Sequence, residues 1–409
     1  MNSATGEYCF LGKALDNLGI CHTPKETFLF DVRVADSIHQ FEQDWNSLLP
    51  PGHWLSSSYG LLYEKSATSG ISYRYVLVYQ EQKPIMCFAF QLIRIRPENL
   101  RTQLKNKFIK YAAQVMLNLH DISLLVSGNV FKDRSASFYF IPSALSDTQA
   151  TQLFTKALEL VATKEGVSAI MLKDMENNAM LPSIGKLEKL EGDISMRMEL
   201  DPSWTSLKNY QAALSKKYAA RAKKILQAAK DLEVKELDLE EIEANKHLLH
   251  TLYKQVLKHQ PFLFGELNEN YFSTVKRQFG NAFCIKGLYL QGTLVAFFST
   301  FSHDDELDVH YVGMEYTLNA TYSLYFYIHF LVLEQAILQK KKWLYMGRTS
   351  LEAKAILGCT PVYNATYVHF RNSLAECVFG YFKKDIVESD NWKTRNPLKA
   401  SQQVEVGEF

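Results

Sequence analysis

The chain has 409 residues, of which 47% are hydrophobic, and its formal net charge is +1. This length predicts two or three domains, and the balanced charge excludes a general attraction to nucleic acid or to an anionic membrane, so a polyanion would need a local patch. The six cysteines have neither metal-ligand spacing nor a dense disulfide pattern, which excludes a zinc module and a disulfide scaffold. We expect no metal site.

The N-terminal segment, residues 1–26, mixes glycine, threonine, proline and single apolar residues, and we expect it to be poorly ordered. It lacks a basic stretch followed by a long apolar one, so the sequence predicts no signal peptide. The most apolar helical pattern, residues 322–338, includes His329 and Glu334 and is typical of a core helix rather than a membrane span. The expected location is therefore the cytoplasm.

The first half of the chain alternates strand and helix patterns. Apolar and aromatic runs bounded by turn residues predict strands at residues 28–34, 73–79, 84–95, 122–126, 137–141 and 167–172. Helical spacing of apolar residues predicts helices at residues 36–49, 100–119 and 147–165. The polar turn Lys173-Asp174 follows the last strand.

The second half repeats this order of elements. It is expected to hold strands at residues 282–290, 293–301, 307–312 and 343–346, and a long helix at residues 322–339. The polar turn Gly347-Arg348 again follows the last strand. The repetition predicts an α/β protein with two similar domains in tandem, and its hairpins indicate mixed sheets, because purely parallel sheets lack hairpins. The expected domains are residues 27–195 and 196–388, followed by a flexible tail at residues 389–409.

Residues 343–361 carry two cations at the end of an apolar strand. The strand ends at Gly347, Arg348 follows at once, and the next residues predict a short helix that carries Lys354 and ends at Gly358. In open α/β sheets, ligands tend to bind at such strand ends. The alternative is a docking helix with ordinary surface charges.

Residues 205–232 form a basic segment with helical spacing. Its apolar residues fall on one stripe, and Arg221 lies inside that stripe. A buried guanidinium needs partners, so we expect Arg221 to bind either an internal carboxylate or carbonyl groups, or else a ligand anion. Lys217 and Lys224 lie at the border of the stripe, where they offer a second interpretation, RNA binding.

Two stretches resemble a known family. The first stretch is residues 214–225 of the basic segment. The second begins with Val312-Gly313-Met314, continues through the helix at residues 322–336, and ends with Gly347-Arg348-Thr349-Ser350 followed by Lys354 and Gly358. They resemble the FemABX-like proteins and their relatives with BioF2-like acetyltransferase domains, which belong to the GNAT superfamily. The resemblance extends over residues 203–371. It implies two tandem GNAT-like acyltransferase domains and an N-acyltransferase that moves an acyl or aminoacyl group to a primary amine.

The same resemblance implies acyl-CoA as co-substrate, no tightly bound cofactor and a small-molecule amine as acceptor, with aminoacyl-tRNA as the alternative donor. The glycine-rich turn that binds pyrophosphate in GNAT proteins corresponds here to residues 316–321, which contain no glycine. The helix that follows can still present backbone N–H groups to phosphate. The residues assigned to anion binding are Lys217, Arg221, Lys224, Tyr316, Asn319, Tyr322, Arg348 and Lys354.

Acyl transfer to an amine needs a proton acceptor and donors for the oxyanion. Glu306, Asp308 and His310 alternate with apolar residues and would share one face of a strand. We expect Asp308 and His310 to act as base and orienting group, and Tyr311, Tyr316 or Tyr322 to act as an acid toward a leaving thiolate. The alternatives are a polar strand face that meets solvent, and a binding protein that kept the fold and lost the chemistry.

Overall fold

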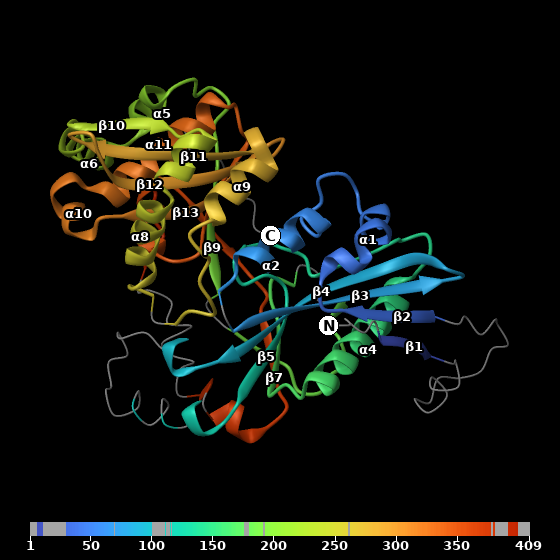
Figure 1. Ribbon diagram of the computed structural model, residues 1–409. Helices are drawn as coiled ribbons and strands as arrows, with labels where there is room; N and C mark the ends of the chain where they lie inside the picture. Colours follow the sequence, from blue (N-terminus) through green and yellow to red (C-terminus); the bar gives the residue numbers. More distant parts are fainter. Residues whose placement is uncertain are drawn as a thin grey trace.

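The computed structural model describes residues 6–10, 30–68, 70–99, 111, 115, 117–175, 180–190, 193–260, 262–377, 379–380 and 392–399. Two mixed β-sheets dominate these residues, which confirms the predicted α/β class with mixed sheets (Figure 1). No helix in the described part of the chain is both long and apolar enough to cross a bilayer.

The first sheet has the strand order β1-β2-β3-β4-β5-β7-β16-β8, with β6 paired to β4. Its members are β1 (Gly6–Phe10), β2 (Phe30–Ala35), β3 (Ile71–Gln80), β4 (Lys83–Ile95), β5 (Ile122–Ser127), β6 (Phe138–Phe140), β7 (Ala169–Leu172), β8 (Glu188–Lys189) and β16 (Tyr367–Phe370). Strand β1 lies in the segment expected to be poorly ordered, and its five residues pair with β2 instead.

The second sheet has the order β10-β11-β12-β13-β14-β9-β15. Its members are β9 (Ile194–Glu199), β10 (Leu232–Glu236), β11 (Phe283–Leu290), β12 (Thr293–Ser302), β13 (Glu306–Met314), β14 (Trp343–Gly347) and β15 (Thr360–Tyr363). Both predicted hairpins, β3–β4 and β11–β12, are present with the expected turns.

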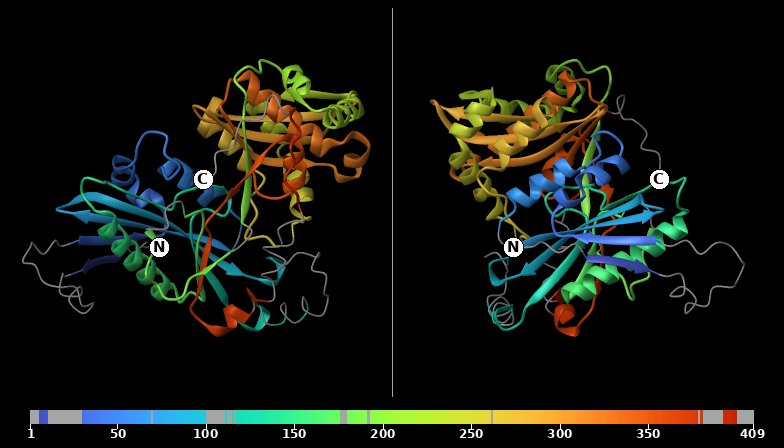
Figure 2. Two further views of the ribbon diagram at one scale, coloured as in Figure 1. Left: turned by 180° about the vertical axis from the view of Figure 1, so that it is seen from behind. Right: turned by 45° about the vertical axis from the view of Figure 1, so that its right-hand side comes forward.

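The two sheets share one connectivity, which supports the predicted duplication. In each sheet, a run of antiparallel strands ends in a parallel pair, β5 with β7 and β13 with β14. The next strand is antiparallel and comes from elsewhere in the chain, because β9 pairs with β14 and the late strand β16 pairs with β7. Figure 2 shows the red C-terminal segment crossing to the first sheet. The expected 196–388 domain therefore gives β16 to the other sheet.

Helices form three layers around and between the sheets (Figure 1). Helix α4 covers the outer face of the first sheet. Helices α1 and α2 pack with α7, α8 and α9 in one apolar cluster that also includes side chains of both sheets. Helices α5, α6, α11 and α12 cover the far face of the second sheet. Their bounds are α1 (Glu42–Leu48), α2 (Ser57–Ser66), α4 (Asp147–Glu165), α5 (Leu207–Ala213), α6 (Lys216–Ala228), α7 (Leu239–Ala244), α8 (Lys246–Leu257), α9 (Tyr271–Phe279), α10 (Tyr316–Tyr322), α11 (Leu324–Leu338) and α12 (Leu351–Leu357).

The basic segment is two helices rather than one. Helix α5 ends and α6 begins around Leu214 and Ser215, where Leu214 forms a bridge with Leu398 and the Ser215 amide donates to the Pro397 carbonyl at 2.8 Å. Residues 392–399 of the predicted flexible tail therefore hold the α5–α6 junction. Most of the predicted helix at residues 100–119 lies outside the described residues.

Candidate functional site

The parallel strands β13 and β14 separate inside the second sheet. They pair only over Glu306–Asp308 of β13, which continues to Met314 while β14 ends at Gly347. Backbone groups of β13 that face the resulting gap need another partner. In the first sheet, the β5–β7 pairing runs to the strand ends, and a Cβ atom on Gly128 would lie 2.8 Å from the Cβ of Lys173. The first sheet is therefore closed at the corresponding place.

A cavity of about 260 Å³ lies at this gap. Its walls come from both halves of the chain: the loop after β5, helices α8 and α11, strands β9, β13 and β14, and the turn that leads into α12. Because α8 and α11 lie on opposite faces of the second sheet, the cavity reaches both faces through the gap. Five predicted site residues line it: Asp308, His310, Tyr311, Arg348 and Lys354.

His310 lies on a β-bulge at the gap. Val309 pairs with Thr300 and Val312 with Phe298, so both His310 and Tyr311 face the single residue Ser299. The His310 Nε2 atom lies 2.5 Å from the hydroxyl of Tyr271 on α9. Burial, together with the charge of Lys132, holds the pKa of His310 well below its usual value. The imidazole is therefore neutral near pH 7.

Asp308 binds cations of the first half instead of orienting His310. Its carboxylate accepts from Lys132 Nζ at 3.2 Å and from Arg134 Nη2 at 3.1 Å, and Arg134 also binds Glu306 at 2.9 Å. The predicted pairing of Asp308 with His310 is wrong. Among the described residues, the side chain that forms a hydrogen bond with the His310 imidazole is Tyr271.

Tyr311 also departs from its predicted role as an acid. Its hydroxyl donates to the Phe131 carbonyl at 3.0 Å, so the proton is already committed to a loop of the first half. Burial raises the pKa of Tyr311 well above its usual value. Tyr311 therefore joins the two halves rather than supplying a proton.

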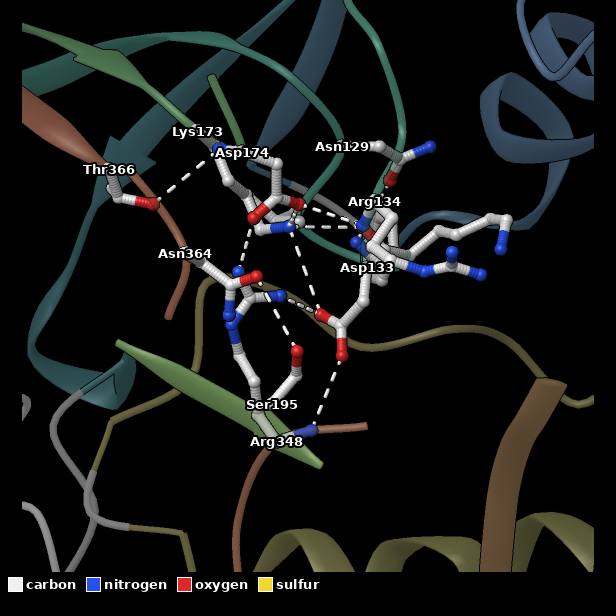
Figure 3. A network of polar contacts seen from close by, with 12 residues as sticks. Asn129, Asp133, Arg134, Lys173, Asp174, Ser195, Arg348, Asn364 and Thr366 are labelled. Atoms are coloured by element: carbon white, nitrogen blue, oxygen red, sulfur yellow. Dashed lines mark hydrogen bonds and ion pairs between the residues drawn. The ribbon is translucent and has the colours of Figure 1, made fainter. Parts of the chain in front are cut away.

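Arg348 is the centre of an ion-pair network between the halves (Figure 3). Its Nε donates to Asp193 at 2.5 Å, and its two Nη atoms donate to Asp133 and Asp174. Asp133 follows β5, Asp174 follows β7 and Asp193 precedes β9, so three chain segments converge on one guanidinium. Lys173 Nζ adds a second cation, 2.5 Å from Asp174.

The guanidinium of Arg348 is therefore saturated by internal carboxylates, which corrects its predicted role in binding a ligand anion. Burial by itself would raise the pKa values of Asp133 and Asp193, but the charge and hydrogen bonds of Arg348 outweigh burial and hold both below the usual value. Asp133 and Asp193 therefore stay ionised near neutral pH.

Lys354 supports the turn that carries Arg348. Its side chain is 3% exposed, and its Nζ donates to the carbonyls of Gly347 at 3.0 Å and Arg348 at 2.5 Å. Gly347, Thr349 and Ser350 all have positive φ angles, so this turn is tightly constrained. Burial and the nearby charge of Lys354 lower the pKa of His329 to about 3.

The other predicted anion-binding residues lie outside the cavity. Lys217, Arg221 and Lys224 are exposed on α6. The expected burial of Arg221 is wrong: its apolar neighbours Ala222 and Ile225 are buried as expected, whereas Arg221 itself is exposed. Its guanidinium instead lies 4.8 Å from the ring centre of Phe326, in the first turn of α11.

The three residues of the predicted phosphate segment have structural contacts around the start of α11. Asn319 Oδ1 accepts from the Tyr325 amide at 3.0 Å and so caps α11. The ring of Tyr316 stacks on His259 with 3.8 Å between the ring centres. Tyr322 packs half-buried against the core of the second half.

The sequence interpretation missed several residues that build the site: Lys132, Asp133, Arg134, Asp174, Asp193 and Tyr271. A usable signal was present for the first three, because they form a charged run just after the apolar strand β5 and its Gly128-Asn129 turn. Nothing local marked Asp193 or Tyr271. Among the described residues, no group of three or more His, Cys, Asp or Glu side chains is arranged to hold a metal ion.

The sequence matches no protein-family model and no curated protein. The structure is similar to FemX, with a TM-score of 0.49 and 8% identity over 85% of this chain and 98% of that chain. A tandem GNAT protein from the clavulanic acid biosynthesis pathway gives a TM-score of 0.44 and 9% identity over 90% of this chain and 99% of that one. L-PGS from Bacillus licheniformis gives 0.45 and 12% identity, with 86% and 97% covered.

Proposed function

We propose that this chain is an N-acyltransferase that moves an acyl group from acyl-CoA to a primary amine. The observation that carries the proposal is the cavity at the gap between β13 and β14, where an unpaired strand edge adjoins a neutral histidine. A strand edge offers backbone N–H groups to a carbonyl oxygen, and a neutral imidazole can accept a proton.

In the proposed reaction, the amine nitrogen attacks the thioester carbon, and the oxyanion is bound by backbone N–H groups of β13 in the gap. The amine proton passes to the free ring nitrogen of His310, whose Nε2 is held by Tyr271. The C–S bond then breaks, the amide is released, and the leaving thiolate takes the proton that His310 accepted. His310 is the proton acceptor, and Tyr271 orients it.

The phosphates of the donor are assigned to the start of α11. Asn319 caps this helix, its N-terminus favours anions, and the exposed guanidinium of Arg221 lies over Phe326 in its first turn. This arrangement needs no glycine-rich turn, since exposed cations supplement the helix N–H groups. Arg221 therefore keeps its assignment to anion binding, but as an exposed side chain rather than a buried one.

The test is a calorimetric titration with CoA and acyl-CoA, combined with turnover on a panel of small amines. We expect Arg221→Met to weaken CoA binding about tenfold, whereas Lys223→Met, an exposed change on the same helix, has little effect. His310→Gln should lower turnover by roughly 10²- to 10⁴-fold with binding retained. Absence of heat with CoA and every acyl-CoA would remove acyl-CoA as the donor.

A second candidate is an aminoacyl-tRNA-dependent transferase, favoured by the exposed cations Lys217, Arg221 and Lys224 of α6. It predicts tRNA binding that weakens steeply with salt. A gel shift at low salt with no retarded species would end this candidate. A binding protein without chemistry would instead bind the donor and show no turnover that depends on His310.

A further inference from the structure

Apolar side chains form much of the cavity lining near α8, where Tyr253 and Gln260 also line it. Val256 and Leu257 of α8 and Val312 of β13 line it from the second half, and Val130 and Phe131 line it from the first. Leu257 and Phe131 belong to the apolar cluster shared by both halves. The charged residues described above occupy other parts of the lining, around Asp308 and Arg348.

The size of the cavity exceeds what the smallest acyl group needs. An engineered apolar cavity of about 150 Å³ accommodates benzene, a six-carbon molecule, and this cavity measures about 260 Å³. A thioester carbonyl at the edge of β13 would direct its acyl chain past Val312 toward α8. The single methyl group of an acetyl donor would leave most of this apolar wall uncovered.

We propose that the transferred acyl group carries an apolar chain of about six carbons or more, held between α8 and the Val130-Phe131 loop. This inference rests on the proposed acyl transfer and names its substrate class. It gives the first half a direct function, since Val130 and Phe131 complete the acyl site that the second half alone would leave open.

The test compares the affinities of CoA, acetyl-CoA, hexanoyl-CoA and octanoyl-CoA by calorimetry. Each methylene buried in the cavity should tighten binding about fourfold, so hexanoyl-CoA, with its four additional methylenes, should bind up to about 250-fold tighter than acetyl-CoA. Val256→Phe fills the apolar wall and should reduce this ratio below about fivefold. Leu248→Phe, an exposed change on the same helix, should preserve the ratio.

Acetyl-CoA binding as tightly as hexanoyl-CoA would overturn the inference. If Val256→Phe fails to fold, Val256→Ala should shift the preference toward octanoyl-CoA, and an unchanged preference would also overturn it. Titration with N-acetylcysteamine thioesters of the same acyl groups distinguishes a failure of this inference from a failure of acyl-CoA as the donor. Binding of its hexanoyl thioester without any response to CoA supports the acyl site and removes CoA as the carrier, whereas no binding in either series overturns both.

Discussion

The guanidinium of Arg348 joins loops that are far apart in the chain, so its removal should cost far more than removal of a surface cation. Arg348→Met leaves Asp133, Asp174 and Asp193 close together without their shared cation. We expect the free energy of unfolding in urea to fall by about 2–4 kcal/mol. Arg371→Met, which removes a more exposed pair with Glu159, should cost below about 1 kcal/mol. Equal losses in the two variants would contradict the role of Arg348.

The same network predicts acid sensitivity. The pKa values of Asp133 and Asp193 are depressed in the folded state, so their stabilising effect is present above the unfolded value of about 3.9 and is lost as pH falls toward the folded values. The melting temperature of the wild type should therefore drop steeply below about pH 4. Arg348→Met should show a smaller drop between pH 5 and pH 3, and a parallel drop would refute the assignment.

At the scale of residues, the sequence located part of the site. Asp308, His310, Arg348 and Lys354 do meet at one cavity, because charged residues near strand ends gather at the same edge of a sheet. Their pairing with Lys132, Asp174 and Tyr271 could not be predicted, since these three residues lie on other elements, two of them in the other half of the chain. Arg221 was misplaced although the apolar residues of its stripe, such as Ala222 and Ile225, are buried as predicted.

At the scale of elements, the tail segment 392–399 should control the α5–α6 junction. Its Pro397 carbonyl accepts from the Ser215 amide at 2.8 Å, and its Lys399 amide donates to the Ala213 carbonyl at 3.0 Å. A chain that stops after residue 391 should therefore exchange the Ser215 amide at least about tenfold faster in hydrogen-exchange measurements. Amides of α4 serve as the internal control. Unchanged protection at Ser215 would show that the tail does not hold this junction.

Elements with strong local signals were predicted well. Helix α4 has the predicted bounds, because a capping box at Ser146 and the left-handed Gly166 define its ends. The hairpins followed from their turn residues. The break at Leu214-Ser215 was missed although Ser215, the N-cap of α6, is of a residue type that favours helix starts. The contact of Ser215 with the distant Pro397 could not be predicted from any local pattern.

At the scale of the whole molecule, each sheet contains a strand that comes from elsewhere in the chain, β9 in the second sheet and β16 in the first. This arrangement should prevent the two halves from folding separately. Residues 1–191 lack β16, which leaves β7 as an open edge, although all four of its residues are buried in the full chain. We expect this fragment to aggregate, because an apolar unpaired edge promotes association. A synthetic peptide covering residues 364–377 should reduce the aggregation measured by light scattering. A monomeric fragment with its own cooperative melting transition would contradict this expectation.

The most direct test of the proposed chemistry is a crystal structure of the protein with a thioether analogue of hexanoyl-CoA, which cannot transfer its acyl group. The account predicts that the carbonyl lies between β13 and β14 beside His310, with the phosphates at the start of α11 near Arg221 and the chain against Val256. Binding of the analogue at another surface, with the gap between the strands left empty, would contradict the account.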